Sequence, residues 1–382
     1  TLLGPKKFNT GVKAYLKKHD GDAATVEDFI RCFEIAGKVD LSQFFLWYRQ
    51  AGTPVLHVSS DYDGDKKSFT IEIEQSLSPT PGQPRKKLMH MPLRMGLIGG
   101  TSQKEILPSS ISGADHHGDV FEIRNRKHKV VFHGVNERPV LSINRGFSAP
   151  VEVNYRHTDK ELVFLSAYDS DPFVRWQAFR TIAIRQILSA MRAMQKRKKP
   201  KWNAAFLNAA HDITIDETME PALRAVTLTL PSESELARMI GRNIDPDAIH
   251  AARKALLSAI GETFGDLHVQ MRKTLKPADQ YSPSAEEAGK RDLSNLLLAY
   301  GLYANSETAE KAVLKQFKSA DNMSEREFAF RMILQEMADT PKITLNLSAL
   351  KKKNLEEQKD MSITEVQEQM SSEKSTIKET KV

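Results

Sequence analysis

The chain has little cysteine, no long apolar run and no leader-like segment. Cys32 is the one cysteine among 382 residues, so no disulfide can form within the chain, and a reducing compartment is favoured. No run approaches the roughly 20 apolar residues that a membrane helix needs. No basic, apolar and small-residue stretches follow one another as in a secretory signal. We therefore predict a cytoplasmic protein without a membrane partner.

An excess of charge of one sign is also missing. The net charge is +6, and basic and acidic residues are interleaved except in the run RAMQKRKKPK at 192–201. Such a run could neutralise nucleic-acid phosphates. However, cations are also favoured at a helix C-terminus, Pro200 is placed to end the helix, and only Trp202 is near enough to stack on a base. We predict a solvated helix end and no nucleic-acid partner.

Metal-binding and nucleophilic motifs are absent as well. None of the eleven histidines is followed by glutamate, so the His-Glu-x-x-His pattern of zinc peptidases does not occur. His116 and His117 are adjacent, while His128 and His133 are five residues apart in a predicted strand region, and all four are interpreted as surface or hydrogen-bonded residues. Cys32 stands among apolar residues, which predicts a buried structural thiol.

Two near-matches to known motifs fail. A calcium loop would begin at Asp61, but Lys66 replaces its glycine, so a polar hairpin at Asp63-Gly64 is expected instead. The sequence Gly146-Phe147-Ser148-Ala149-Pro150 begins like a nucleophile elbow and ends in proline where that motif has glycine. We assign no catalytic, metal-binding or substrate-binding residue to this chain.

What the sequence does contain is a clear order of patterns, which starts with helices. Helical spacing extends from Pro5 to about Gln50, with short breaks at 20–21 and 37–38. Thr25 can cap a helix with Asp28 three positions later, and an apolar stripe follows at Val26, Phe29, Ile30 and Phe33. A strand is then predicted to start at 53–55, so this segment joins two domains.

The middle of the chain alternates with the period of strands. Apolar residues occupy every second position at 69–73, 91–97, 130–132, 141–143 and 151–155, as half-buried strands do. Proline and glycine clusters at 79–84 and 98–101 supply turns. These short strands without intervening helices predict an immunoglobulin-like antiparallel β-sandwich over residues 52–157.

Helical spacing returns after residue 158. One stripe contains Trp176, Phe179, Ala183, Ile187, Met191 and Met194, which we interpret as core. Further helix starts are predicted at Ser232 with Glu235, at Asp245 before Pro246, and at Ser324 with Glu327. We expect stacked antiparallel helix pairs, an α-helical solenoid, over 158–340. Residues 341–382 are rich in Lys, Glu, Gln and Ser, which predicts a disordered tail.

Several motifs resemble those of the aminopeptidase N family of zinc exopeptidases, of the bacterial alanyl aminopeptidase type. They occur in the family's order at His19-Asp20-Gly21-Asp22-Ala23-Ala24-Thr25-Val26-Glu27-Asp28-Phe29, Trp47-Tyr48-Arg49-Gln50-Ala51-Gly52-Thr53-Pro54, Ser78-Pro79-Thr80-Pro81-Gly82-Gln83, Asp171-Pro172-Phe173-Val174-Arg175-Trp176, Leu230-Pro231-Ser232-Glu233 and Asp245-Pro246. The resemblance implies that residues 1–51 are the last helices of a peptidase catalytic domain. It also implies that the zinc-binding part lies upstream of Thr1.

The resemblance implies peptidase activity for the intact enzyme and a supporting role for the part that this chain represents. Family members use zinc to remove N-terminal residues from peptides, the sandwich links the catalytic and helical domains, and the helical domain covers the active-site cavity. We expect this chain to hold no cofactor of its own, to be inactive alone and to have the missing catalytic domain as partner. The alternative is a free-standing sandwich-plus-solenoid module that binds a protein or peptide.

Overall fold

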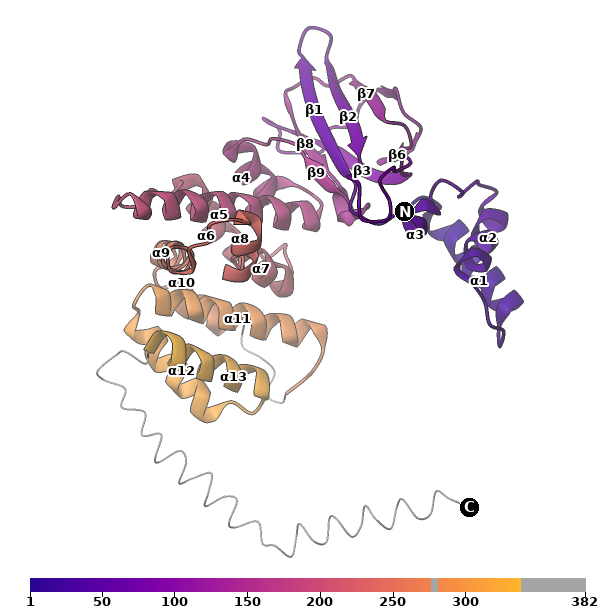
Figure 1. Ribbon diagram of the computed structural model, residues 1–382. Helices are drawn as coiled ribbons and strands as arrows, with labels where there is room; N and C mark the ends of the chain where they lie inside the picture. Colours follow the sequence, from indigo (N-terminus) through magenta and orange to yellow (C-terminus); the bar gives the residue numbers. More distant parts are fainter. Residues whose placement is uncertain (276–280, 338–382) are drawn as a thin grey trace, which may run out of the picture. The chain divides into compact units, whose positions relative to one another are not determined.

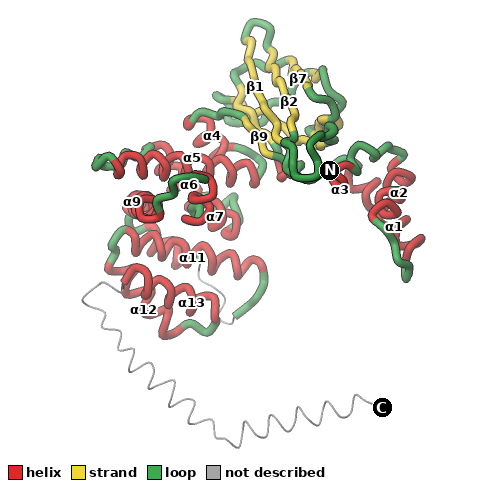
Figure 2. The backbone as a smooth tube through the Cα atoms, in the orientation of Figure 1, coloured by secondary structure: helices red, strands yellow, loops and turns green. Residues whose placement is uncertain are grey.

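The protein is represented by a computed structural model that describes residues 1–275 and 281–337. The chain divides into one unit over 1–312 and a second that starts at Val313, and each is described by itself. Within the first unit, three helices are followed by strands and then by further helices, as Figures 1 and 2 show. The predicted tail at 341–382 lies outside the described residues.

The N-terminal helices are α1 (Gly4–His19), α2 (Val26–Gly37) and α3 (Leu46–Arg49). Helix α2 begins with the predicted capping box, since Thr25 Oγ1 accepts from Asp28 N and Asp28 Oδ2 accepts from Thr25 N. Phe29 and Phe33 of the predicted stripe pack with ring centroids 4.6 Å apart. They belong to one apolar cluster that joins α1, α2 and the segment after α2, where Leu41 is buried.

The segment around α3 fastens these helices to the sandwich. The side-chain amide of Gln43 donates to the carbonyls of Leu88 and Arg124, at 3.2 and 2.9 Å. Trp47 Nε1 donates to His90 O at 3.0 Å. These side chains satisfy backbone carbonyls of the sandwich, so the predicted junction is a hydrogen-bonded contact.

The strands form a two-sheet sandwich around one apolar core. One sheet has the order β4-β7-β2-β1-β9 and the other β5-β6-β3-β8. Their bounds are β1 Val55–Asp63, β2 Ser68–Ser76, β3 Met91–Gly99, β4 Ser110–Ser112, β5 His116–His117, β6 Val120–Ile123, β7 Lys127–His133, β8 Pro139–Ile143 and β9 Glu152–Asn154. One pair departs from the predicted antiparallel pattern, because β9 runs parallel to β1.

The hairpin between β1 and β2 contains the near-match to a calcium loop. Asp63 is opposite Ser68, and its Oδ1 accepts from the backbone N–H of Lys66 at 2.9 Å. Asp63 thus closes a polar turn, as expected for this hairpin.

Strand β3 differs from the prediction of a half-buried strand, because nearly every residue of it is buried. Met91, Leu93, Met95 and Leu97 face the sandwich core. On the other face, Pro92 lies beside the N-terminal helices, and Gly96 lies against the guanidinium of Arg145. The N-terminal helices and Arg145, which are distant from β3 in the sequence, therefore cover the face of the strand that the alternating pattern predicted to be exposed to solvent.

The following helices build a second apolar core. They are α4 Asp159–Tyr168, α5 Pro172–Gln195, α6 Ala204–Ile215, α7 Pro221–Leu228, α8 Glu233–Ile240, α9 Pro246–Phe264, α10 Leu267–Thr274 and α11 Ala285–Tyr303. Helix α5 buries Phe179, Ala183 and Ile187 of the predicted stripe. The predicted caps at Ser232 and Asp245 begin α8 and α9. No described helix is both long and apolar enough to span a membrane.

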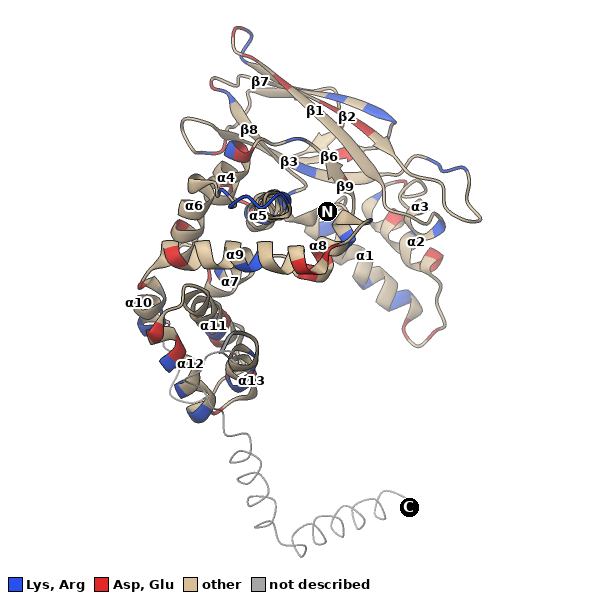
Figure 3. Cartoon of the chain, turned by 60° about the vertical axis from the view of Figure 1, so that its left-hand side comes forward, with Lys and Arg blue, Asp and Glu red and all other residues tan. Residues whose placement is uncertain are grey.

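The basic run at 192–201 does not form the helix end that was predicted, because most of it lies beyond the helix. Helix α5 stops at Gln195, five residues before Pro200, and Arg197 takes a left-handed φ of 55°. Of the run, only Arg192 stands in the last helical turn, and the cations of 196–199 are exposed in the following loop (Figure 3). Proline was therefore not what ended the helix.

Beyond these helices, α12 (Glu307–Ser319) leads from the first unit into the second, which also contains α13 (Met323–Met332) and a π-helical turn at Ile333–Met337. The prediction of Ser324 as cap of the last helix was wrong. Asn322 begins it, accepting from Glu325 N at 3.0 Å. Asparagine caps a helix as well as serine does, and Asn322 stands two residues before Ser324.

Candidate functional site at the junction of sandwich and helices

The histidines that the sequence singled out have structural surroundings. His116, His117 and His133 are exposed, and His128 Nε2 accepts from the backbone N–H groups of Arg124 and Asn125. Burial lowers the pKa of His128, which keeps the accepting imidazole neutral. Cys32 is 5% exposed within α2.

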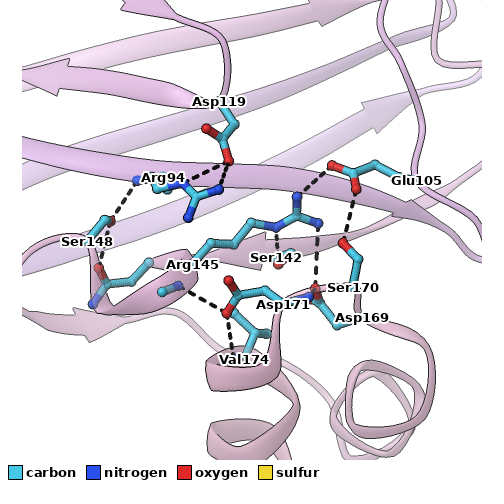
Figure 4. Close-up of polar contacts among 12 residues, drawn as sticks. Arg94, Glu105, Asp119, Ser142, Arg145, Ser148, Asp169, Ser170, Asp171 and Val174 are labelled. Atoms are coloured by element: carbon cyan, nitrogen blue, oxygen red, sulfur yellow. Dashed lines mark hydrogen bonds and ion pairs between the residues drawn. The ribbon is translucent and has the colours of Figure 1, made fainter. Parts of the chain in front are cut away.

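Two motifs from the sequence meet where the sandwich joins the helices (Figure 4). Asp171 caps α5, because its Oδ1 accepts from Val174 N at 3.0 Å. The same oxygen accepts from Gly146 N, also at 3.0 Å, in the loop after β8. One carboxylate oxygen therefore joins the former elbow candidate to the first turn of α5.

A buried arginine occupies the centre of this junction. Arg145 is 4% exposed, its Nη1 is 2.5 Å from Glu105 Oε1, and its Nε donates to Ser142 Oγ at 2.7 Å. Its Nη2 is 3.6 Å from Oδ1 of Asp169, whose side chain is fully buried. Glycine at 96 leaves room for the guanidinium, because a Cβ there would collide with it.

Opposing effects act on the pKa of the Asp169 carboxyl. Burial raises the pKa of its carboxyl, while hydrogen bonds from Ser142 and from Asp171 N, together with the charge of Arg145, act in the opposite direction. Asp169 Oδ2 has no hydrogen-bond partner. The carboxylate thus depends on Arg145 for its charge compensation.

The loop between β8 and β9 is fixed in an unusual conformation. Asn144, Gly146 and Phe147 all have positive φ, of 58°, 59° and 50°. Asn144 Oδ1 accepts from Ala149 N and from the hydroxyl of Ser148. Ser148 Oγ in turn accepts from Arg94 N at 2.8 Å, so its hydroxyl is engaged in holding the loop.

Sequence reasoning missed Arg145, Asp169 and Glu105. The available signals were two aspartates flanking Ser170 ahead of Pro172, and an arginine between an apolar strand and a glycine. These residues are 24 to 64 positions apart, and no spacing rule connects them. Only the packing of sandwich against helix brings them together.

A second feature of the same region is apolar. A cavity of about 440 Å³ lies between the N-terminal helices and the sandwich, and its lining includes Leu3, Phe33, Trp47, Pro92, Ser148 and Pro150. Phe8 and Tyr48, which also line it, are 49% and 54% exposed. Exposed aromatic surface around an apolar hollow is typical of a protein contact site.

The chemistry of these side chains does not fit a zinc centre. Across 1–275 and 281–337, no three His, Cys, Asp or Glu side chains are grouped to hold a metal ion. His157 Nε2 donates to the carbonyl oxygen of Leu141 at 2.8 Å, and His90 Nε2 lies 3.1 Å from Glu122 Oε2. The junction can hold two domains together and offers apolar surface.

Comparison with known proteins gives the same architecture. Residues 52–156 match a domain of unknown function (DUF3458) with an Ig-like fold, and residues 159–359 match a domain of unknown function (DUF3458_C) with ARM repeats. Both matches confirm the predicted sandwich followed by a helical repeat domain. A crystal structure of Legionella pneumophila aminopeptidase A in complex with aspartic acid superposes with a TM-score of 0.72 over 87% of this chain and 37% of that chain, at 23% identity.

Two curated relatives are aminopeptidase N proteins. The chain is 32% identical over 325 residues to aminopeptidase N of Escherichia coli K12, covering 85% of this chain and 37% of the relative. It is 36% identical over 327 residues to aminopeptidase N of Caulobacter vibrioides, covering 85% and 36%. The chain thus spans little more than a third of the length of these relatives. It belongs to the family of Ig-like and ARM-repeat (DUF3458) proteins and corresponds to a C-terminal portion of aminopeptidase N.

Proposed function

We propose that this chain is the non-catalytic C-terminal part of a zinc-dependent aminopeptidase N, which removes N-terminal residues from peptides. The observation that carries the proposal is the match along 85% of this chain to 36–37% of aminopeptidase N relatives. The described residues hold no metal-binding group. Zinc and catalytic residues would then belong to the part of the enzyme that this chain does not match.

The chain's role in that enzyme is support. Residues 1–51 present Phe8 and Tyr48 around the apolar cavity, and we assign the peptidase domain to this surface. Gln43 and Trp47 fasten these helices to the sandwich. Arg145 and Asp171 fasten the sandwich to the first helices of the ARM-repeat domain. A peptidase domain bound at one end is thereby held at a defined distance from the helical domain.

The helical domain supplies access control in this proposal. By covering the catalytic cavity, it would admit short peptides and exclude folded proteins. The compartment we propose is the cytoplasm, in line with a single cysteine, Cys32, that is buried and cannot pair within the chain.

The test is the genomic sequence upstream of the Thr1 codon. An open frame that carries His-Glu-x-x-His is expected if this chain is part of an enzyme. A promoter and start codon directly before Thr1 would contradict the proposal and favour the free-standing binding module.

A further inference from the structure

Three aromatic rings follow one another across the junction of sandwich and helices. The ring centroids of Phe147 and Phe173 are 5.3 Å apart, and those of Phe173 and Trp176 are 5.5 Å apart. Phe147 is 54% exposed, and the other two side chains are partly exposed. We call Phe147, Phe173 and Trp176 the aromatic ladder.

Phe147 is exposed to solvent and has a strained backbone conformation. Its φ of 50° is in the left-handed region, which a β-carbon disfavours, and glycine or asparagine would adopt it more easily. The Asn144 side chain, the Asp171 carboxylate and the Ser148 hydroxyl fix the loop around it. A strained backbone that presents a large apolar side chain to water is typical of a contact residue.

The charges beside the ladder are already paired. The Arg180 guanidinium lies 5.6 Å from the Trp176 ring centroid and bonds to Glu235 at 2.9 Å. At the other end, Arg94 bonds to Asp119 at 2.7 Å. The ladder therefore presents an apolar strip between neutralised ion pairs. Such a strip fits an apolar patch on a folded protein, and it does not fit a polyanion.

The ladder continues the apolar surface at the N-terminal helices. Phe147 directly precedes Ser148, and Ser148 and Pro150 line the apolar cavity that also contains Phe8 and Tyr48. Aromatic residues in the centre of a contact dominate binding energies. A partner seated on the cavity would reach the ladder along the rim of the sandwich. The remaining part of the relatives is large enough to be this partner, because 63% of the Escherichia coli protein lies outside the match.

We propose that the aromatic ladder is a second docking contact for the peptidase domain, with Phe147 as its anchor. This inference rests on the proposed function, and it adds that the domain contacts the sandwich rim and the first turns of α5. The peptidase domain then bridges the sandwich and the ARM-repeat domain. Its contact keeps both in a fixed orientation.

The experiment mixes the full chain with a polypeptide comprising the part of Caulobacter vibrioides aminopeptidase N that this chain does not match. Dissociation constants are measured by sedimentation velocity. Phe147→Asn removes the ring and suits the left-handed φ, so thermal unfolding of the chain should be unchanged or shifted upward. We expect the variant to weaken binding at least about tenfold. The matched control is Tyr168→Asn, an exposed aromatic outside the ladder, which should change binding less than about twofold.

A further variant separates the two proposals. Tyr48→Asn alters the cavity and should weaken binding whether or not the ladder takes part. Loss of binding in Tyr48→Asn with unchanged binding in Phe147→Asn would overturn the ladder contact and leave the proposed function standing. No binding by the wild-type chain at micromolar concentrations would overturn both. Self-association of the chain that Phe147→Asn abolishes would also overturn the inference, since a second copy would then be the occupant.

Discussion

Replacing Arg145 by methionine is expected to destabilise the junction severely. Methionine retains an aliphatic stem and removes the charge that compensates Asp169, whose side chain is fully buried. Breaking a buried ion pair by removing one partner costs about 3–5 kcal/mol, because the remaining charge is left without compensation. Glu105 contributes less to this loss, because its side chain is 40% exposed and can be hydrated.

The pH dependence identifies Asp169 as the cause. Burial already raises the pKa of its carboxyl, and removing Arg145 raises that pKa further. A carboxyl whose folded pKa lies above its unfolded value stabilises the fold most at low pH. That contribution is lost as pH rises through the folded pKa. Arg145→Met should therefore cost less at pH 5 than at pH 8.

The assay is urea unfolding of wild type, Arg145→Met, Asp169→Asn and the double variant at both pH values. In the double variant no buried charge remains, so at least about half of the loss should be recovered at pH 8. The loss of unfolding free energy that remains in the double variant should be the same at pH 5 as at pH 8. A single-variant cost below about 1 kcal/mol, or losses that simply add, would refute the charge-compensation argument.

Further predictions concern other parts of the fold. Gly96→Ala places a Cβ against the buried Arg145 guanidinium and should cost about 1–3 kcal/mol in urea unfolding, and a neutral effect would contradict this packing. Thr158→Ala removes the cap of α4 and should cost about 1 kcal/mol, measured the same way against Thr10→Ala, an exposed threonine inside α1, as control. Burial lowers the pKa of His157, so its contribution is present above about pH 6.5 and lost as pH falls toward the folded pKa. His157→Gln should reduce the slope of stability against pH by at most about 1.4 kcal/mol per unit, and an unchanged slope would exclude His157 as its source.

Local rules predicted the elements that depend on neighbouring residues. The box at Thr25 and Asp28 was recognisable because both partners lie within one turn, and the α5 stripe because its period follows the helix. The domain limits drawn at residues 51, 157 and 340 stay predictions. The sandwich and the helical repeat are confirmed.

Tertiary contacts explain what the sequence could not predict. Strand β3 is buried on its outer face because Arg145 and the N-terminal helices cover Gly96 and Pro92. The pairing of Arg145 with Asp169 depends on the docking of the first helices against the sandwich. Phe147 was interpreted only as part of a failed elbow motif, because neither its exposure nor its contact with Phe173 can be read from spacing.

The most direct test of the central claim is zinc content together with hydrolysis of an alanyl chromogenic substrate by the purified chain. Among residues 1–275 and 281–337, no three His, Cys, Asp or Glu side chains are grouped to hold a metal ion, so no zinc-activated water is expected. We expect zinc far below one ion per chain and no turnover above background. Stoichiometric zinc with turnover that a chelator abolishes would contradict it.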